Sequence, residues 1–232
     1  MYLGVDGFSN GWCCCSFNGN MTIKIIPEIK NILDYDNYSK ILIDIPIGLS
    51  SRKAERKIDN QLRTLLPSGR KSSVFNAPTR KSAYANTYDE AKKAEIEQLG
   101  KSLSIQSWNI TNKIKEVDQF LTTNTQLNNI VCESHPELCF YYLNNMKPLL
   151  FSKRTVDGLN ERMKILNHYH HQSQELLEDF FQKNKKTGIK KDDIADSMVL
   201  CISAKNWIKN GKRTINNQPN KDEKGISFGI HF

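Results

Sequence analysis

The sequence predicts an α/β fold built on a mixed sheet of five strands, three antiparallel and then parallel ones, flanked by helices. The chain opens with short strand-like runs joined by tight turns, and two later runs are apolar enough to be buried strands. Helical patterns lie between and after them. At 232 residues the chain can bury one good core. We therefore expect a single domain over residues 1–232, with a mainly helical insertion at about residues 50–128.

The first three strands are predicted at the start of the chain. Leu3 and Val5 alternate with smaller or polar residues, and residues 12–17 and 22–26 form two further strand-like runs. The last two runs are joined by Asn18-Gly19-Asn20, and Asn-Gly is the strongest short signal for a hairpin turn. The pattern therefore predicts an antiparallel meander of three strands.

A parallel strand is predicted next. Residues 27–38 favour a short helix, and residues 40–47 are too apolar on both faces for anything but a central strand. A strand, a helix and a strand in succession indicate a right-handed parallel crossover. The segment from residue 50 to 129 is polar, basic and mostly helical in pattern, with a loop predicted at residues 67–78.

The last third of the chain alternates strands and helices. Residues 129–133 regain strand character, residues 155–181 have a helical pattern, and residues 183–188 form a charged connector. An amphipathic helix is predicted at residues 192–210. The tail at residues 226–232 alternates apolar residues with smaller or polar ones, which is compatible with an edge strand.

The charge of the chain bears on its partners. The net charge is +8, and basic residues crowd two segments, residues 52–81 and 183–191. A polyanion such as nucleic acid is the natural partner for such a surface, although a solvated lysine-rich surface would give the same count. No stretch is apolar for the length of a membrane span, and the six cysteines lack the spacing of a zinc site. We expect a soluble cytoplasmic protein with no membrane partner and with buried, free cysteines.

Four aspartates are the strongest candidates for a functional site. Asp6 and Asp44 follow apolar runs, and carboxylates in such positions are rarely buried unless they are paired or bind a cation. If the two strands are parallel neighbours, both carboxylates emerge at the same edge of the sheet. Asp193 and Asp196 lie three residues apart, so they share one face of the predicted helix, although Asp193 could simply cap it. Oxygen ligands favour Mg²⁺, Mn²⁺ or Ca²⁺.

A second candidate is the run Glu133-Ser134-His135-Pro136-Glu137. In an extended backbone Glu133, His135 and Glu137 would face one side. Glu133 would then be a further metal ligand, and His135 a proton carrier or a phosphate contact. The alternative is that His135 and Pro136 only shape the exit of a strand.

A set of short motifs extends over nearly the whole chain. They are Gly4-Val5-Asp6-Gly7, Gly11-Trp12, Ile43-Asp44-Ile45-Pro46-Ile47-Gly48-Leu49, Ser72-Ser73-Val74-Phe75, Pro78 with Arg80, Glu133 with His135-Pro136-Glu137, Ser152-Lys153, Gly158 with Arg162, and Asp192-Asp193 with Asp196. Together they resemble an uncharacterised family, catalogued as a domain of unknown function with the number four-two-nine and described as a predicted nuclease. The order of strands and acidic residues also resembles the ribonuclease H-like superfamily, and the late helix looks like that of Holliday-junction resolvases.

This resemblance implies a ribonuclease H-like fold and a set of site residues. Asp6, Asp44 and Asp196 would be the core metal ligands, with Asp193 and Glu133 as accessory ones. The expected metal is Mg²⁺ or Mn²⁺. The residues that would bind the substrate are Arg63, Arg80, Lys153 and Arg162.

Three function hypotheses remain open on the sequence alone. The leading one is a divalent-metal-dependent nuclease that hydrolyses phosphodiester bonds of DNA or RNA through its carboxylates. A non-catalytic module that binds nucleic acid or protein and keeps a structural ion site is the alternative. A nucleotide-binding ATPase or kinase-like domain is the third, but that class normally needs two such domains and glycine-rich phosphate loops. The sequence leaves open whether the chain forms a homodimer.

Overall fold

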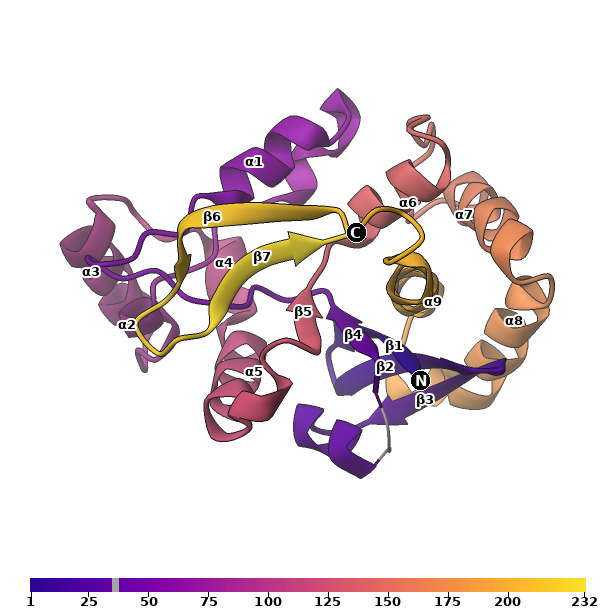
Figure 1. The fold of residues 1–232 in the computed structure, drawn as a ribbon, viewed down its shortest axis with the longest axis horizontal. Helices are drawn as coiled ribbons and strands as arrows, with labels where there is room; N and C mark the ends of the chain where they lie inside the picture. The colour runs from indigo at the N-terminus through magenta and orange to yellow at the C-terminus, as the bar shows by residue number, and fades with distance from the viewer. Residues whose placement is uncertain (35–37) are drawn as a thin grey trace. The chain divides into compact units, whose positions relative to one another are not determined.

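The structure is a computed structural model, and it describes residues 1–34 and 38–232 (Figure 1). It confirms a mixed α/β fold. The chain forms two compact units. The first comprises residues 1–44, 130–213 and 231–232, and the second comprises residues 45–129 and 214–230. Within the described residues, no helix is long and apolar enough to cross a membrane.

In the described part of the chain the sheet has seven strands rather than the five that the sequence predicts. In the first unit the strand order is β3-β2-β1-β4-β5. The predicted meander is confirmed, since β1 (Tyr2–Phe8), β2 (Gly11–Asn18) and β3 (Asn20–Ile26) pair antiparallel. The two parallel strands, β4 (Lys40–Ile43) and β5 (Val131–Glu133), extend the sheet beside β1. The additional strands are β6 and β7, which follow the late helix in the sequence.

The parallel strands are short and fully buried, as their apolar sequences predict. Val5 of β1 lies opposite Ile43 of β4, and Ile43 lies opposite Glu133 of β5. The carboxyl ends of all three strands therefore meet at one edge of the sheet. The helix predicted at residues 27–38 is a shorter 3₁₀ helix, η1 (Ile29–Asp34), and residues 35–37 lie outside the described part.

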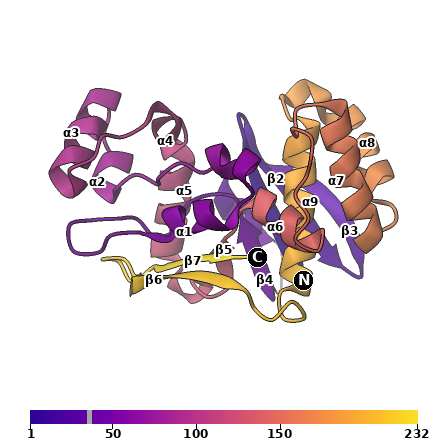
Figure 2. The same ribbon diagram turned by 90° about the horizontal axis from the view of Figure 1, so that it is seen from above.

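Four helices complete the first unit. They are α6 (Pro136–Leu143), α7 (Val156–Tyr169), α8 (Ser173–Asn184) and α9 (Lys191–Asn206), with a 3₁₀ turn, η4 (Lys185–Thr187), before α9. The late helix is thus confirmed as α9, whereas the long helix predicted at residues 155–181 is divided into α7 and α8. Helix α9 packs against β1, β2 and β4, and α6, α7 and α8 pack against α9 (Figures 1 and 2).

Helix α9 lies very close to the sheet at Gly4. A Cβ atom at this position would lie 2.1 Å from the carbonyl oxygen of Ser197 and 2.2 Å from the amide nitrogen of Cys201. Glycine is therefore required for α9 to lie directly on β1. Because side chains two residues apart in a strand point to the same face, Asp6 also faces α9.

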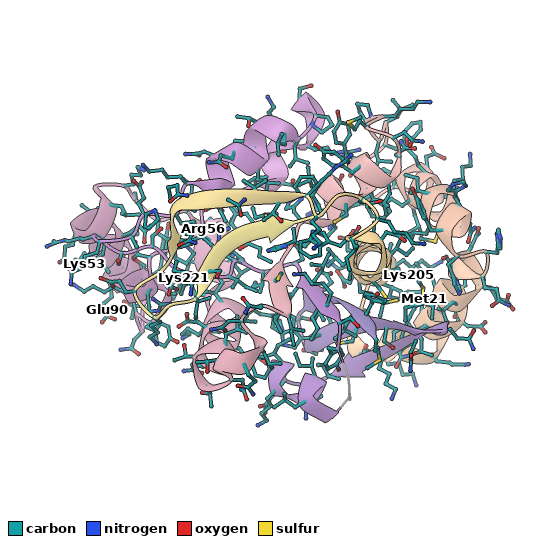
Figure 3. All side chains as sticks on the ribbon, viewed as in Figure 1. Met21, Lys53, Arg56, Glu90, Lys205 and Lys221 are labelled. Carbon is teal, nitrogen blue, oxygen red and sulfur yellow. The ribbon has the colours of Figure 1, made fainter. Side chains whose placement is uncertain are left out.

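The six cysteines are buried and free, as predicted. Cys13 faces α9, where its Sγ atom lies 3.3 Å from Oγ of Ser197. Further along the same interface, Met21 and Lys205 lie close together and line a small cavity of about 60 Å³ (Figure 3). The side chain of Cys13 therefore belongs to the layer between the strands and α9.

The second unit contains the predicted helical segment. Its helices are α1 (Ile58–Leu65), α2 (Arg80–Ala83), α3 (Tyr88–Leu99), α4 (Ile105–Asn109) and α5 (Thr111–Thr123), with 3₁₀ turns η2 (Ser68–Ser73) and η3 (Thr125–Leu127). Strands β6 (Thr214–Lys221) and β7 (Ser227–His231) pair with each other, and α1 packs against β6 (Figure 2). A strand in the tail was predicted, whereas β6 was not. The expected edge position is wrong for β7, because β6 lies beyond it at the end of the strand order.

Candidate functional site

Asp6 and Asp44 lie side by side at the carboxyl edge of the sheet in the first unit. Asp6 is buried near the end of β1, and Asp44 directly follows β4. The backbone N–H of Asp44 donates to the carbonyl oxygen of Val5 at 3.0 Å, which continues the parallel pairing past the end of β4. The prediction that these two strands are parallel neighbours is confirmed.

Helix α9 provides Asp193 and Asp196 from its first two turns. Asp196 is almost fully buried, with 1% of its surface exposed, and it faces the sheet. Asp193 is partly exposed, and its Oδ2 accepts a hydrogen bond from the backbone N–H of Lys190 at 2.9 Å. Asp193 therefore caps the helix, which was the structural alternative for this residue.

The carboxylate of Asp196 contacts a lysine from the preceding loop. Lys153 lies in the loop between α6 and α7, and its Nζ atom is 2.5 Å from Oδ2 of Asp196. The other oxygen of Asp196, Oδ1, is buried and has no hydrogen-bond partner among the described residues. A buried carboxylate oxygen without a donor is costly, so this atom is a natural ligand for a cation.

The pKa values show that the aspartates form one electrostatic cluster. Burial and then the charge of Asp196 raise the pKa of Asp6 well above its ordinary value, and the same two causes raise the pKa of Asp44 to about 7. Burial likewise raises the pKa of Asp193 to about 6. Although burial lowers it, the pKa of Lys153 is raised by the charges of Asp196 and Asp6. Negative charge in this cluster thus exceeds what Lys153 compensates.

A cation with more than one positive charge would suit this cluster. Among the described residues, no group of three or more Asp, Glu, His or Cys side chains stands in an arrangement that could hold a metal ion. In this arrangement the ammonium group of Lys153 contacts Oδ2 of Asp196. The donors themselves suit a hard cation, since they are carboxylate oxygens and one of them is buried without a partner.

The second candidate run is divided between a strand and a helix. Glu133 ends β5 and is buried, whereas Pro136 begins α6 and Glu137 belongs to its first turn. The expectation that Glu133, His135 and Glu137 share one side of an extended backbone is therefore wrong for Glu137. Burial lowers the pKa of His135 to about 4, so its imidazole is neutral at pH 7.

Glu137 instead pairs with Arg162 of α7. The guanidinium group of Arg162 is fully buried, and it donates to Oε1 of Glu137 and to the carbonyl oxygen of Gly158. Sequence reasoning missed this pair, which lies 25 residues apart along the chain. Of the four residues expected to bind the substrate, Lys153 contacts the aspartate cluster, whereas Arg162 is enclosed within the fold.

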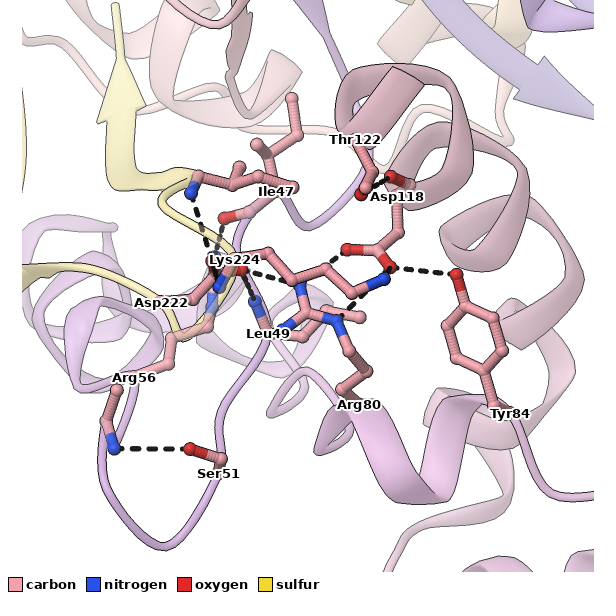
Figure 4. A network of polar contacts seen from close by, with 12 residues as sticks. Ile47, Leu49, Ser51, Arg56, Arg80, Tyr84, Asp118, Thr122, Asp222 and Lys224 are labelled. Carbon is pink, nitrogen blue, oxygen red and sulfur yellow. Dashed lines mark hydrogen bonds and ion pairs between the residues drawn. The ribbon is translucent and has the colours of Figure 1, made fainter. Parts of the chain in front are cut away.

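Arg63 and Arg80 belong to the second unit. Arg80 is held between two buried carboxylates, at 2.6 Å from Asp118 and 2.6 Å from Asp222 (Figure 4). Tyr84 donates a further hydrogen bond to Asp118. The charge of Arg80 is thus compensated inside the unit. Arg63 donates to uncharged acceptors, among them the carbonyl oxygen of Val74 at 2.9 Å, and lines a cavity of about 370 Å³.

Comparison with known proteins identifies one match. The family model described as "Protein of unknown function (DUF429)" matches residues 4–223. No curated protein and no solved structure matches the chain significantly. The match covers every candidate residue of the site, from Asp6 to Asp196.

Proposed function

The chain belongs to the DUF429 family, and we propose that it is a divalent-metal-dependent nuclease that hydrolyses phosphodiester bonds of DNA or RNA. The observation that carries this proposal is the convergence of Asp6, Asp44 and Asp196 from β1, β4 and α9. Burial raises the pKa values of all three carboxyl groups, and the charge of Asp196 raises those of Asp6 and Asp44 further. Such a cluster favours cation binding and metal-assisted hydrolysis.

A ribonuclease H-like fold is part of the proposal. The order β3-β2-β1-β4-β5 in the first unit supports it, since three antiparallel strands are followed by two parallel ones. The positions of the acidic residues support it as well. One lies on the first strand, one follows the fourth, and the late helix contributes the Asp193 and Asp196 pair.

Asp6, Asp44 and Asp196 would hold Mg²⁺ or Mn²⁺, with Asp193 and Glu133 as accessory ligands. When bound, the metal would activate a water molecule for attack and stabilise the leaving oxygen. Lys153 must release Asp196 for this to occur. Its long side chain reaches the cluster from a loop, and a change of its rotamer would free the carboxylate.

The residues of the cluster then have distinct tasks. Asp44 and Asp193 are partly exposed, so they mark the side from which a substrate phosphate enters. Lys153 stays protonated because its pKa is raised, and its ammonium group can contact that phosphate once it leaves Asp196. His135, neutral at pH 7, can donate or accept a hydrogen bond but does not supply a positive charge. The net charge of +8 favours the approach of nucleic acid.

The test is cleavage of labelled DNA and RNA in the presence of Mg²⁺ or Mn²⁺. Asp6→Asn and Asp196→Asn should each reduce cleavage at least 100-fold and leave nucleic-acid binding intact, because they remove ligand charge without changing side-chain size. Asp179→Asn, on the exposed surface of α8, is the matched control and should cleave normally. Full activity in both cluster variants would refute the proposed site.

The contact between Lys153 and Asp196 favours a second candidate, a non-catalytic binding module. In that case Lys153 is a permanent counter-ion, and the carboxylates serve the fold alone. A cleavage assay separates the two functions, since this module would cleave no substrate, and calorimetry with Mn²⁺ then shows whether the carboxylates hold an ion or only the ammonium group of Lys153. Metal binding without cleavage of any DNA or RNA would indicate a structural ion site.

A further inference from the structure

The loop between α6 and α7, residues 144–155, exposes apolar side chains next to the aspartate cluster. Leu150 is 80% exposed and Phe151 is 47% exposed, and Val156 at the start of α7 is 76% exposed. Large apolar side chains gathered on one short segment are unusual on the surface of a folded protein. Such patches commonly mark a site of interaction.

The backbone of this loop is fixed by several contacts. The carboxylate of Glu161 accepts hydrogen bonds from the N–H groups of Leu150 at 2.9 Å and Phe151 at 3.2 Å. A Cβ atom on Gly158 would lie 1.8 Å from the carbonyl oxygen of Ser152, so the loop lies directly on α7. Leu150 and Phe151 are therefore presented to solvent by a fixed backbone rather than by a loose one.

The same loop carries Lys153 into the cluster. Lys153 lies two residues after Phe151, so their Cα atoms are within about 7 Å of each other. Arg154, the next residue, is exposed. The loop thus combines exposed apolar groups, an exposed cation, and a lysine bonded to Asp196.

We propose that this loop binds unpaired bases of a nucleic acid strand, with Phe151 and Leu150 against the bases and Arg154 against the backbone phosphates. The substrate of the proposed nuclease is then single-stranded, or has a single-stranded segment at the site. The inference rests on the proposed function, because a nucleic acid strand bound to this loop would lie beside the aspartate cluster that is proposed to cleave it.

The chemistry of the loop distinguishes an unpaired strand from other occupants. Phosphates and sugars of a duplex offer polar groups, whereas an unpaired base offers an apolar face on which an aromatic ring can stack. The exposed cation of the loop, Arg154, suits a polyanion and does not suit a basic protein surface. A second copy of this chain, with its net charge of +8, would place more positive charge against it.

The experiment measures binding by fluorescence anisotropy in EDTA, which prevents metal-dependent cleavage. Labelled single-stranded DNA and RNA are compared with duplexes of the same sequence. We expect Phe151→Ala to weaken single-strand binding about tenfold and duplex binding much less, because stacking on an aromatic ring is lost. Phe151→Tyr keeps the ring and should bind like the unchanged protein. Leu150→Ala should weaken binding more mildly.

Ile208→Ala is the matched control, since Ile208 is 66% exposed and lies outside the loop. It should leave binding unchanged. Three results would each overturn the inference. Phe151→Ala could weaken duplex and single-strand binding equally, it could leave binding unchanged, or it could dissociate a dimer of this chain. The last result would assign the patch to contact between copies.

Failure of the inference and failure of the proposed function remain distinguishable. Single-strand binding that depends on Phe151, without cleavage of any substrate, would support the loop and refute the nuclease. Cleavage that depends on Asp6 but not on Phe151 would support the nuclease and refute the loop.

Discussion

Nζ of Lys153 lies 2.5 Å from Oδ2 of Asp196, while Oδ1 of the same carboxylate is buried without a hydrogen-bond partner in the part of the chain that the structure describes. Half of this carboxylate is thus satisfied by an ammonium group and half is not. Burial raises the pKa of Asp196, and Lys153 opposes that rise. The ammonium group of Lys153 is therefore already a cation in this cluster, but it carries a single charge and is attached to a long side chain.

This relationship predicts competition between Lys153 and a divalent ion. Lys153→Met keeps the aliphatic stem and removes the ammonium group, so a bound metal no longer meets a positive charge a few ångströms away. We expect Mn²⁺ to bind at least tenfold more tightly, a change of about 1.4 kcal/mol, in isothermal titration calorimetry. Lys164→Met, at an exposed position of α7, is the control and should leave the affinity unchanged. Equal affinities in all three proteins would show that Lys153 does not stand in the place of the metal.

The raised pKa of Asp44 predicts how pH affects stability. In the unfolded chain an aspartate loses its proton near pH 4, whereas Asp44 in the folded protein keeps it until about pH 7. Unfolding between these values therefore releases a proton, so the contribution of Asp44 to stability is lost as pH rises from about 4 to 7. The free energy of unfolding should fall by about 2 kcal/mol relative to that of Asp44→Asn over this range. A fully buried carboxyl group would give a larger change, but Asp44 is partly exposed.

Urea unfolding of both proteins at several pH values measures this difference. The difference in stability between the unchanged protein and Asp179→Asn should show no comparable pH dependence, because Asp179 is exposed and both proteins keep Asp44. Adding Mg²⁺ above pH 7 should restore the stability of the unchanged protein but not that of Asp44→Asn. A stability difference that rises with pH between 4 and 7 would contradict the raised pKa.

Gly4 determines how closely α9 lies on β1. A Cβ atom at Gly4 would overlap with backbone atoms of Ser197 and Cys201, which cannot rotate away as a side chain can. We expect Gly4→Ala to reduce the free energy of unfolding by about 3 kcal/mol. It should also weaken Mn²⁺ binding, because Asp196 precedes Ser197 on the displaced helix. Gly69→Ala, where a Cβ atom would meet open space, should change stability by less than about 1 kcal/mol.

The strands that carry the candidate ligands could be predicted because their apolar runs and turns are local signals. Asp6 and Asp44 follow such runs, and their parallel pairing follows from the strand, helix and strand order. Helix α6 was not predicted, because Pro136 looked like the end of a strand, although proline is favourable in the first turn of a helix. Strand β6 was missed because its residues are mostly polar and include Pro219.

The charge partners of the site could not be predicted in the same way. Lys153 lies 43 residues from Asp196 along the chain, and no spacing rule connects them. The buried pair of Glu137 and Arg162 likewise depends on how α6 and α7 pack, which tertiary structure alone decides. Residue types indicated which groups bear charge, whereas the packing of helices determined which charges meet.

Arg80 shows the same distinction, because the sequence suggested a phosphate contact and the structure places it between Asp118 and Asp222 (Figure 4). Arg80→Met would leave two buried carboxylates without their guanidinium partner. We expect a loss of about 3 kcal/mol in the free energy of unfolding, measured with urea. Lys81→Met is the control on the same helix: its ion pair with Glu97 is exposed, and its loss should cost less than about 1 kcal/mol.

A binding measurement then separates the structural role of Arg80 from a phosphate contact. If Arg80 serves the fold, folded Arg80→Met should bind nucleic acid with unchanged affinity and with the same dependence on salt concentration. A phosphate contact would instead weaken binding and reduce the slope of log affinity against log salt by about one unit. A smaller salt slope with unchanged stability would therefore indicate that Arg80 contacts the substrate. If Arg80 were instead the partner of the two buried carboxylates, its removal would reduce the free energy of unfolding.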